Sequence, residues 1–157
     1  MNIDVEPATL SDKPVLRRLL QLYLYDFTEF APEDLDEHGE YAYRYLDHYW
    51  APNDGEERHP FLIRADGKLA GFALIRRPPG RAWQMAEFFV LRMYRRHGVG
   101  RAAALRIFRT FSGEWQVAQL RANTPAQAFW RRTIAEATND HYTEESNDEA
   151  VIQRFTT

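Results

Sequence analysis

The chain of 157 residues contains no cysteine. It can therefore form no disulfide, it offers no thiolate to a metal, and any group transfer it performs cannot pass through a cysteine-bound intermediate. Its five histidines are scattered along the chain without the short spacing typical of metal ligands. We expect no metal site.

Long apolar segments are also missing. No run approaches the roughly 20 residues that a membrane-spanning helix needs, and the first residues lack the basic and apolar regions of a signal peptide. We therefore expect a cytoplasmic protein that does not bind membranes. The length, with 45% hydrophobic and 27% charged residues, is typical of a single globular domain spanning residues 1–157.

An excess of positive charge is missing as well, since the formal net charge is −3. This argues against general nucleic-acid binding. Arginines nevertheless gather between Arg92 and Arg109, and a local basic run of this kind suits one phosphorylated ligand.

The most informative segment runs from 90 to 102 and reads VLRMYRRHGVGRA. There an apolar strand enters an arginine-rich turn containing Gly98 and Gly100, and an alanine-rich helix follows. Glycines let backbone N–H groups turn toward a ligand, and the start of a helix carries a partial positive charge. The segment therefore predicts a cradle for a pyrophosphate.

The spacing Arg95-x-x-Gly98-x-Gly100, with Val90 five residues before it, resembles the acetyl-CoA signature of the GNAT superfamily of N-acetyltransferases. Arg92 stands where that signature often has proline and Arg96 where it often has glycine, but neither change removes a backbone donor. The resemblance implies that acetyl-CoA is the cofactor. Its pyrophosphate would lie against Arg95, Arg96, His97, Gly98, Val99, Gly100 and Arg101.

Two other interpretations of this segment stay open. Gly98, Gly100 and Ala103 also satisfy the G-x-G-x-x-A pattern of dinucleotide-binding turns. That fold expects an acidic residue about twenty positions later, where this chain has Leu120 and Arg121, and more chain than the fifty-seven residues that follow Gly100. The segment could also be an ordinary turn with solvated arginines, since short glycine motifs are weak signals.

The pattern of apolar residues predicts the other elements. In chain order they are a strand at 3–5, helices at about 15–23 and 41–50, strands at 61–64, 69–75 and 83–91, a helix at 99–111, a strand at 115–122, a helix at 124–135, and a hairpin from about 142 to 155. Asp66-Gly67 is the strongest hairpin signal. A capping box from Thr124 to Gln127 is expected to start the last helix.

The expected order of elements is therefore β-α-α-β-β-β-α-β-α-β-β, which is an α+β arrangement. It is similar to the GNAT fold, a mixed and mostly antiparallel sheet flanked by helices, along essentially the whole chain. A doubly wound domain would instead alternate strictly between strands and helices. The element order and the glycine motif support each other.

The resemblance also implies cofactor contacts outside the cradle. In the family, the edge of the strand corresponding to 83–91 pairs with the pantetheine amides, which implies backbone contacts from Phe89, Val90 and Leu91. Residues 123–130 resemble the second cofactor segment of the family. This implies contacts from Asn123 and Phe129.

Trp130 departs from the family pattern, because many relatives have at this position a tyrosine thought to protonate the leaving thiolate. An indole cannot act as that acid. Tyr25, Tyr94 and Tyr142 stay open as alternative acids, as does water. Trp130 could also simply pack in the core with Ile134.

A primary amine needs help to lose its proton, since with a pKa of about 10.4 its deprotonation at pH 7 costs roughly 4.6 kcal/mol. Glu87 is the candidate general base, because it lies just before the expected pantetheine contacts and its apolar neighbours can raise its pKa. Several members of the family have a catalytic glutamate on this strand. Glu87 could instead pair with Arg76 or Arg121 on a neighbouring strand.

The segment from 25 to 43 contains seven acidic residues and no lysine or arginine. Together with its aromatic residues it would suit a cationic amine acceptor, although it could also be a solvated loop. The aromatic residues between 41 and 50 could form a packed helix face or the surface of a homodimer.

Three hypotheses result. The first is an N-acetyltransferase that transfers acetyl from acetyl-CoA directly to a primary amine of a small molecule or protein, a route that the lack of cysteine favours. The second is a catalytically silent CoA-binding module. The third is a phosphate- or nucleic-acid-binding domain that uses the basic run from Arg92 to Arg109.

Overall fold

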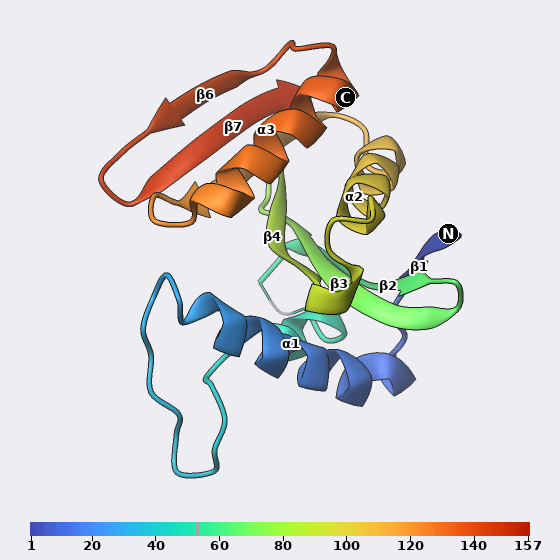
Figure 1. The fold of residues 1–157 in the computed structure, drawn as a ribbon, viewed down its shortest axis with the longest axis vertical. Coiled ribbons are helices and arrows are strands. Elements are labelled where there is room, and N and C mark those ends of the chain that lie inside the picture. Colours follow the sequence, from blue (N-terminus) through green and yellow to red (C-terminus); the bar gives the residue numbers. More distant parts are fainter. Residues whose placement is uncertain (53) are drawn as a thin grey trace.

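The computed structural model describes residues 1–52 and 54–157. A seven-stranded sheet forms its centre, with helices packed against both faces (Figure 1). The elements are β1 (Ile3–Pro7), η1 (Leu10–Asp12), α1 (Lys13–Phe27), η2 (Leu46–Tyr49), β2 (Glu57–Ala65), β3 (Lys68–Arg77), β4 (Trp83–Val90), η3 (Arg92–Tyr94), α2 (Val99–Thr110), β5 (Glu114–Leu120), α3 (Thr124–Thr138), β6 (Thr143–Ser146) and β7 (Ala150–Thr156), where η marks a 3₁₀ helix.

The strands lie in the order β1-β2-β3-β4-β5-β7-β6. All neighbouring pairs are antiparallel except β4 and β5, which are parallel. This confirms the expected α+β class with a mixed, mostly antiparallel sheet. The hairpin of β2 and β3 turns at Asp66 and Gly67, whose φ angles of 49° and 79° are both positive, as a tight two-residue hairpin turn requires.

Side-chain alternation along the strands divides the core between the two faces of the sheet. Phe72 and Leu74 of β3 pack in the cluster formed with α1 and η2. Ala73 and Ile75 of the same strand pack in the cluster formed with α2 and α3. β3 is therefore buried on both sides, and α1 is separated by the sheet from the other two long helices.

The helix expected over 41–50 is wrong, because only Leu46–Tyr49 is helical, as the short element η2. Gln21 of α1 forms two hydrogen bonds of 2.8 Å with the backbone N–H and carbonyl of Tyr41. These groups are therefore paired with another element instead of within a helix. Leu46 and Tyr49, three positions apart, are both buried, and this spacing matches one turn of a 3₁₀ helix.

Candidate functional site

The sheet opens between its two parallel strands. β4 and β5 pair only near their starts, at Trp83 with Trp115 and at Gln84 with Gln116. The rest of β4 is paired with β3 on one side, while its other backbone edge has no strand partner in the described chain. Such an edge can accept an extended ligand as an added strand.

A β-bulge in β4 decides where Glu87 points. Leu74 of β3 lies opposite Glu87, but the next residue, Ile75, lies opposite Met85, so Ala86 is an extra residue. Met85 packs on the α2–α3 side of the sheet, and strict alternation would send Glu87 to that same side. The bulge shifts the alternation by one position, and Glu87 instead lines a pocket beside η2.

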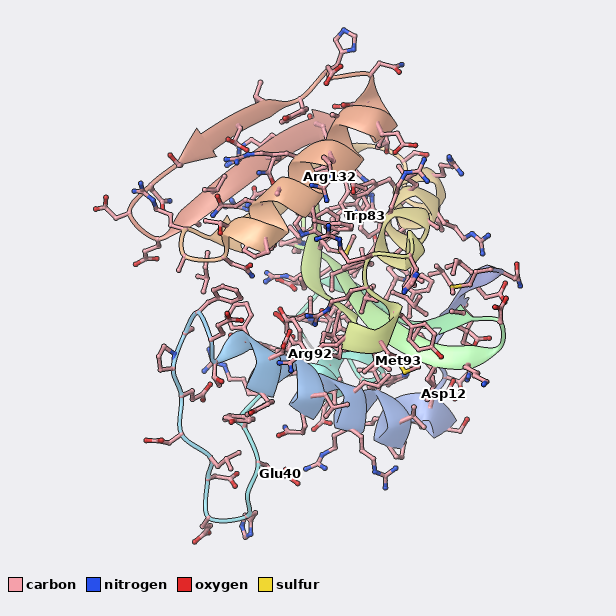
Figure 2. The ribbon with its side chains drawn as sticks, in the orientation of Figure 1. Asp12, Glu40, Trp83, Arg92, Met93 and Arg132 are labelled. Atoms are coloured by element: carbon pink, nitrogen blue, oxygen red, sulfur yellow. The ribbon has the colours of Figure 1, made fainter. Side chains whose placement is uncertain are left out.

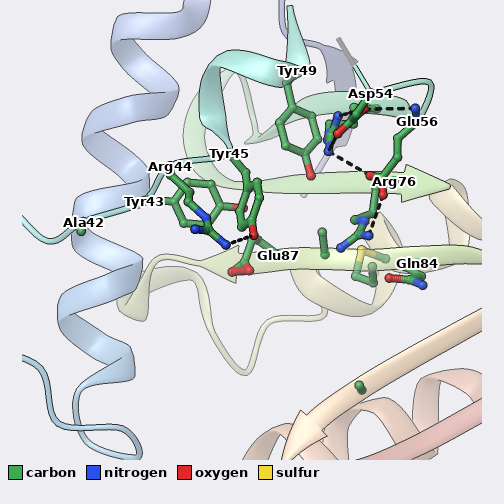
Figure 3. Close-up of a pocket in the computed structure, with 14 residues that line it drawn as sticks. Ala42, Tyr43, Arg44, Tyr45, Tyr49, Asp54, Glu56, Arg76, Gln84 and Glu87 are labelled. Carbon is green, nitrogen blue, oxygen red and sulfur yellow. Dashed lines mark hydrogen bonds and ion pairs between the residues drawn. The ribbon is translucent and has the colours of Figure 1, made fainter. Parts of the chain in front are cut away.

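This pocket has a volume of about 670 Å³ (Figure 3). Tyr43, Tyr45 and Tyr49, from the segment before β2, line one side of it, and Glu87 faces them from β4. Ala118 of β5 also lines the pocket. The pocket is therefore bounded by both strands of the open parallel pair.

Burial raises the pKa of Glu87 to about 7, although the nearby hydroxyl of Tyr23 of α1 opposes the shift. The ion pairs considered from the sequence do not form: Arg76 Nη2 donates to Glu56 Oε1 at 2.8 Å, and Arg121 donates to a backbone carbonyl. In the described part of the chain Glu87 has no cationic partner within ion-pair distance. A carboxyl with a pKa near 7 suits proton transfer at neutral pH.

The segment after β4 has the form of an anion cradle. Arg96 and Gly98 adopt positive φ angles of 66° and 77° before α2 begins at Val99. The backbone N–H groups of residues 96–101 donate to no described residue, as is usual at the start of a helix. A Cβ added at Gly98 would meet no atom within 4 Å. Free donors beside open space fit a pyrophosphate.

The arginine side chains around this cradle are held by acidic residues of the helices. Asp26 of α1 accepts hydrogen bonds of 2.7 Å from both Arg92 and Arg95, and Figure 2 shows Arg92 beside α1. Arg101 pairs with Glu136 of α3. Partial burial raises the pKa of Asp26, but the two arginines outweigh this effect and leave the pKa lowered. The free donors of the cradle are therefore its backbone N–H groups and the side chain of Arg96, which is exposed and pairs with no described carboxylate.

The remaining cradle residues differ in exposure. Arg96 and His97 are exposed, whereas the side chain of Val99 is buried in the core. Gly100 lies against α3, because a Cβ added there would come within 3.3 Å of the Phe129 ring. The structure thus places Phe129 beside the predicted cradle, and its contact with the cofactor stays a prediction.

The residues predicted to contact pantetheine lie at the end of β4. Phe89 is buried in the α1-side cluster and Leu91 packs against it, so their side chains serve the core. Two backbone groups here are already paired: the Val90 carbonyl accepts from Arg95 Nε at 2.8 Å, and the Leu91 N–H donates to Ala70 at 2.8 Å.

Asn123 caps α3, with its Oδ1 accepting from the N–H of Ala126 at 3.2 Å. The capping box expected at Thr124 is wrong, because Gln127 donates to the backbone carbonyls at the end of β5 instead. Asn123 therefore lies where β5 ends and α3 begins, and its side-chain oxygen has a structural partner.

Trp130 is a core residue. Its side chain is buried, and its ring centroid lies 5.0 Å from that of Phe88. The tyrosines considered as acids do not line the pocket. Tyr25 is exposed, and Tyr94 and Tyr142 pack against core clusters on the α2–α3 side. The tyrosines that do line the pocket with Glu87 are Tyr43, Tyr45 and Tyr49.

The acidic segment contributes none of its carboxylates to this pocket. Glu40 pairs with Arg17 of α1, and Asp36 accepts backbone hydrogen bonds from within its own loop. Both line a smaller cavity of about 280 Å³, and Glu40 lies on the loop that extends away from the sheet (Figure 2).

Two α1 residues belong to the site although the sequence did not mark them. The helical pattern identifies Tyr23 only as an apolar-face residue, and Asp26 is one acid among many. Asp26 contacts Arg92, 66 positions later in the chain. No local sequence pattern reports a contact over that separation.

A model of the acetyltransferase (GNAT) family matches residues 17–134. The chain belongs to this family. The matched region runs from α1 through the cradle into α3, so these elements are parts of a GNAT N-acetyltransferase, and the family uses acetyl-CoA. A search of curated proteins gave no significant match.

Solved acetyltransferases share this GNAT fold at low sequence identity. One from Thermus thermophilus has a TM-score of 0.70 at 16% identity, over 100% of this chain and 98% of the other. PaiA N-acetyltransferase from Thermoplasma acidophilum, solved with coenzyme A, has a TM-score of 0.66 at 12% identity over 100% of both chains. The ribosomal-protein-S18-alanine N-acetyltransferase of Escherichia coli has a TM-score of 0.64 at 15% identity, over 99% and 94%.

Within residues 1–52 and 54–157, no helix combines the length and apolar character needed to span a bilayer. In the same residues, no three side chains of the metal-binding types come together in a way that could hold an ion.

Proposed function

We propose that residues 1–157 form one domain that acetylates a primary amine, with acetyl-CoA as the donor and Glu87 as the general base. The observation that carries the proposal is the setting of Glu87. It is a half-buried carboxyl without a cationic partner among the described residues, its pKa is about 7, and its strand leads directly into the anion cradle.

The backbone would bind most of the cofactor. The N–H groups of residues 96–101 suit the pyrophosphate, and the unpaired edge of β4 suits an extended pantetheine arm. Phe129 lies beside the cradle at Gly100. Bound acetyl-CoA supplies an activated thioester carbonyl, and the absence of cysteine favours direct transfer because no thiol can hold the acetyl group.

Glu87 would accept the proton that the amine must lose. With a pKa of about 7, it is much closer to an amine pKa of about 10.4 than an ordinary glutamate is, so the uphill proton transfer costs less. Burial and the nearby Glu87 raise the pKa of Tyr23. Tyr23 therefore stays protonated and can hold the carboxyl in place.

The test compares cofactor binding with turnover. Calorimetry with acetyl-CoA, CoA and ADP measures the affinity of the cradle for each ligand. The release of CoA with a panel of amines measures the rate of acetyl transfer. Glu87→Gln should keep the acetyl-CoA affinity within about twofold and lower kcat at least about a hundredfold. Glu114→Gln, an exposed strand glutamate away from the pocket, is the matched control and should change neither.

The outcomes separate the alternatives. If acetyl-CoA does not bind, the assignment of the cofactor is wrong. If kcat is unchanged in Glu87→Gln, the assignment of Glu87 as the general base is wrong. Tight binding of acetyl-CoA without turnover of any amine would support the hypothesis of a catalytically silent CoA-binding module. The nucleic-acid hypothesis has less support, because Arg92, Arg95 and Arg101 are already paired with carboxylates.

A further inference from the structure

The pocket that contains Glu87 also contains several other charged side chains. Its volume of about 670 Å³ is in the range of small-molecule sites. The ionisable groups other than tyrosine are three arginines and three acids, namely Arg44, Arg58, Arg76, Asp54, Glu56 and Glu87. What the pocket can bind depends on which of these charges already neutralise one another.

Two of the three acids form ion pairs with arginine. Asp54 receives two hydrogen bonds from Arg58, at 2.9 and 2.8 Å. Glu56 lies between two guanidinium groups, with one oxygen 2.8 Å from Arg76 and the other 2.9 Å from Arg58. The charge of each carboxylate is therefore balanced by arginine, although Glu56 Oε2 is buried and accepts no hydrogen bond among the described residues. Glu87 is the single pocket acid without an arginine.

The arginines, in contrast, have donors to spare. Arg76 uses one terminal nitrogen for Glu56, its Nε is buried without a partner, and its side chain is 37% exposed. Arg44 is exposed and lies with its guanidinium carbon 4.9 Å from the Tyr45 ring centroid. Only one of its nitrogens donates, to the Tyr45 hydroxyl at 2.6 Å, and it pairs with no described carboxylate.

We propose that the acceptor amine also carries an anionic group, an amino carboxylate in the simplest case, and that Arg44 and Arg76 bind this group while the amine meets Glu87. The assignment rests on the proposed function of this pocket. Guanidinium groups are well suited to carboxylates because several N–H donors lie in one plane. Figure 3 shows Arg44 beside Tyr43 and Tyr45, Arg76 beside Glu56, and Glu87 on β4 next to Tyr45.

An acceptor with an anionic group differs from the cationic acceptor that the acidic segment 25–43 suggested from the sequence. The acids of that segment do not line the pocket, and the pocket acids other than Glu87 are already neutralised. A polyamine would therefore bring several positive charges to a single carboxyl and place some of them near the guanidinium groups of Arg44 and Arg76.

The experiment uses substrate pairs that differ in the carboxylate alone. L-phenylalanine is compared with L-phenylalaninamide, L-leucine with L-leucinamide, and spermidine represents polycations. CoA release gives kcat/KM for each, and calorimetry in the presence of CoA gives the affinity of each without turnover. The amine of an amino amide is less basic than that of the acid, so proton removal by itself would favour the amide.

We expect kcat/KM to be at least about tenfold higher for the carboxylate of each pair, and calorimetry to show the same order of affinity. Arg44→Gln and Arg76→Gln should each reduce this ratio toward one. Arg76→Lys should restore part of it, because the ammonium keeps the charge beside Glu56. Arg132→Gln, an exposed arginine of α3 outside the pocket, is the control and should keep the ratio.

A preference for amides or spermidine, or a ratio unchanged in both pocket variants, would overturn the proposal while leaving the acetyltransferase function intact. Failure of the function itself would appear as absent acetyl-CoA binding or absent turnover. In that case the calorimetry still decides: carboxylate-selective binding that Arg44→Gln weakens supports the pocket assignment, and unselective or undetectable binding contradicts it.

Discussion

One extra residue, Ala86, gives Glu87 its position. Without the bulge, the side-chain alternation that starts at Met85 would turn Glu87 into the α2–α3 core, where a carboxyl has no compensating partner. With it, the carboxyl reaches the pocket. In the sequence, Glu87 is a candidate base because it lies just before the expected pantetheine contacts and has apolar neighbours. The sequence around Ala86 does not reveal the bulge, because the bulge is defined by how β4 pairs with β3.

Glu87→Gln should change how stability depends on pH. The folded protein keeps the proton of Glu87 up to about pH 7, whereas an unshifted glutamate releases it near 4.5. The folded state therefore binds more protons between these values, so stability falls as pH rises through this window, by on the order of 3 kcal/mol. Glutamine has no such proton to lose.

The variant should thus gain stability relative to the original protein between pH 5 and pH 8. Urea unfolding at both pH values measures the difference, and Glu114→Gln is the control because its carboxylate is exposed. A stability difference that is the same at both pH values would mean that Glu87 titrates like an ordinary carboxyl.

Elements defined by short-range signals were predictable from the sequence. The Asp66-Gly67 hairpin and the turn at Gly98 both require positive φ angles, and the residues that adopt them easily stand there. Residues 41–45 were not predictable, because the hydrogen bonds that hold Tyr41 come from Gln21 on another element. Local periodicity cannot report a competing partner of this kind.

The role of the cradle turn in cofactor binding can be tested with Gly98→Ala, which adds one methyl group. Alanine at Gly98, where φ is 77°, is strained by about 1 kcal/mol and clashes with nothing. If the N–H groups of residues 96–101 bind the pyrophosphate, relaxation of this turn should weaken acetyl-CoA binding about tenfold by calorimetry.

Gly39→Ala is the matched control, because Gly39 has a φ of 73° and equally open space, but lies in the loop after α1. It should cost a similar amount of stability and leave the acetyl-CoA affinity unchanged. Equal effects of both variants on affinity would show that the loss reflects general destabilisation and not the cradle.

In the whole molecule, the candidate site lies where the sheet is incomplete, between β4 and β5. β1–β4 and β5–β7 are joined by only two residue pairs of β4 and β5, where the Trp83 and Trp115 ring centroids lie 6.4 Å apart. Glu87 and the cradle belong to the first half, and Ala118, Asn123 and Phe129 to the second. The sequence predicts the strands and helices of each half from their local patterns. The gap where β4 and β5 separate follows instead from tertiary packing between strands about thirty residues apart in the chain.

Acetyl-CoA should therefore slow amide hydrogen exchange on both sides of this gap. In the free protein the N–H groups of residues 96–101 have no acceptor among the described residues, and one edge of β4 has no described strand partner beyond Gln84. These amides should therefore exchange quickly. Pyrophosphate oxygens and pantetheine carbonyls would supply the missing acceptors. Mass spectrometry should then show at least about tenfold slower exchange in both segments, with no change in the exposed edge strand β6.

ADP separates the two contributions, because it has a pyrophosphate but no pantetheine arm. It should protect residues 96–101 and leave the edge of β4 exchanging as in the free protein. Protection of β4 by ADP to the same extent would mean that the gap closes by itself when the cradle is filled. Protection of the cradle by acetyl-CoA without any effect on β4 would place the pantetheine arm elsewhere, and Glu87 would then lose its proposed access to the thioester.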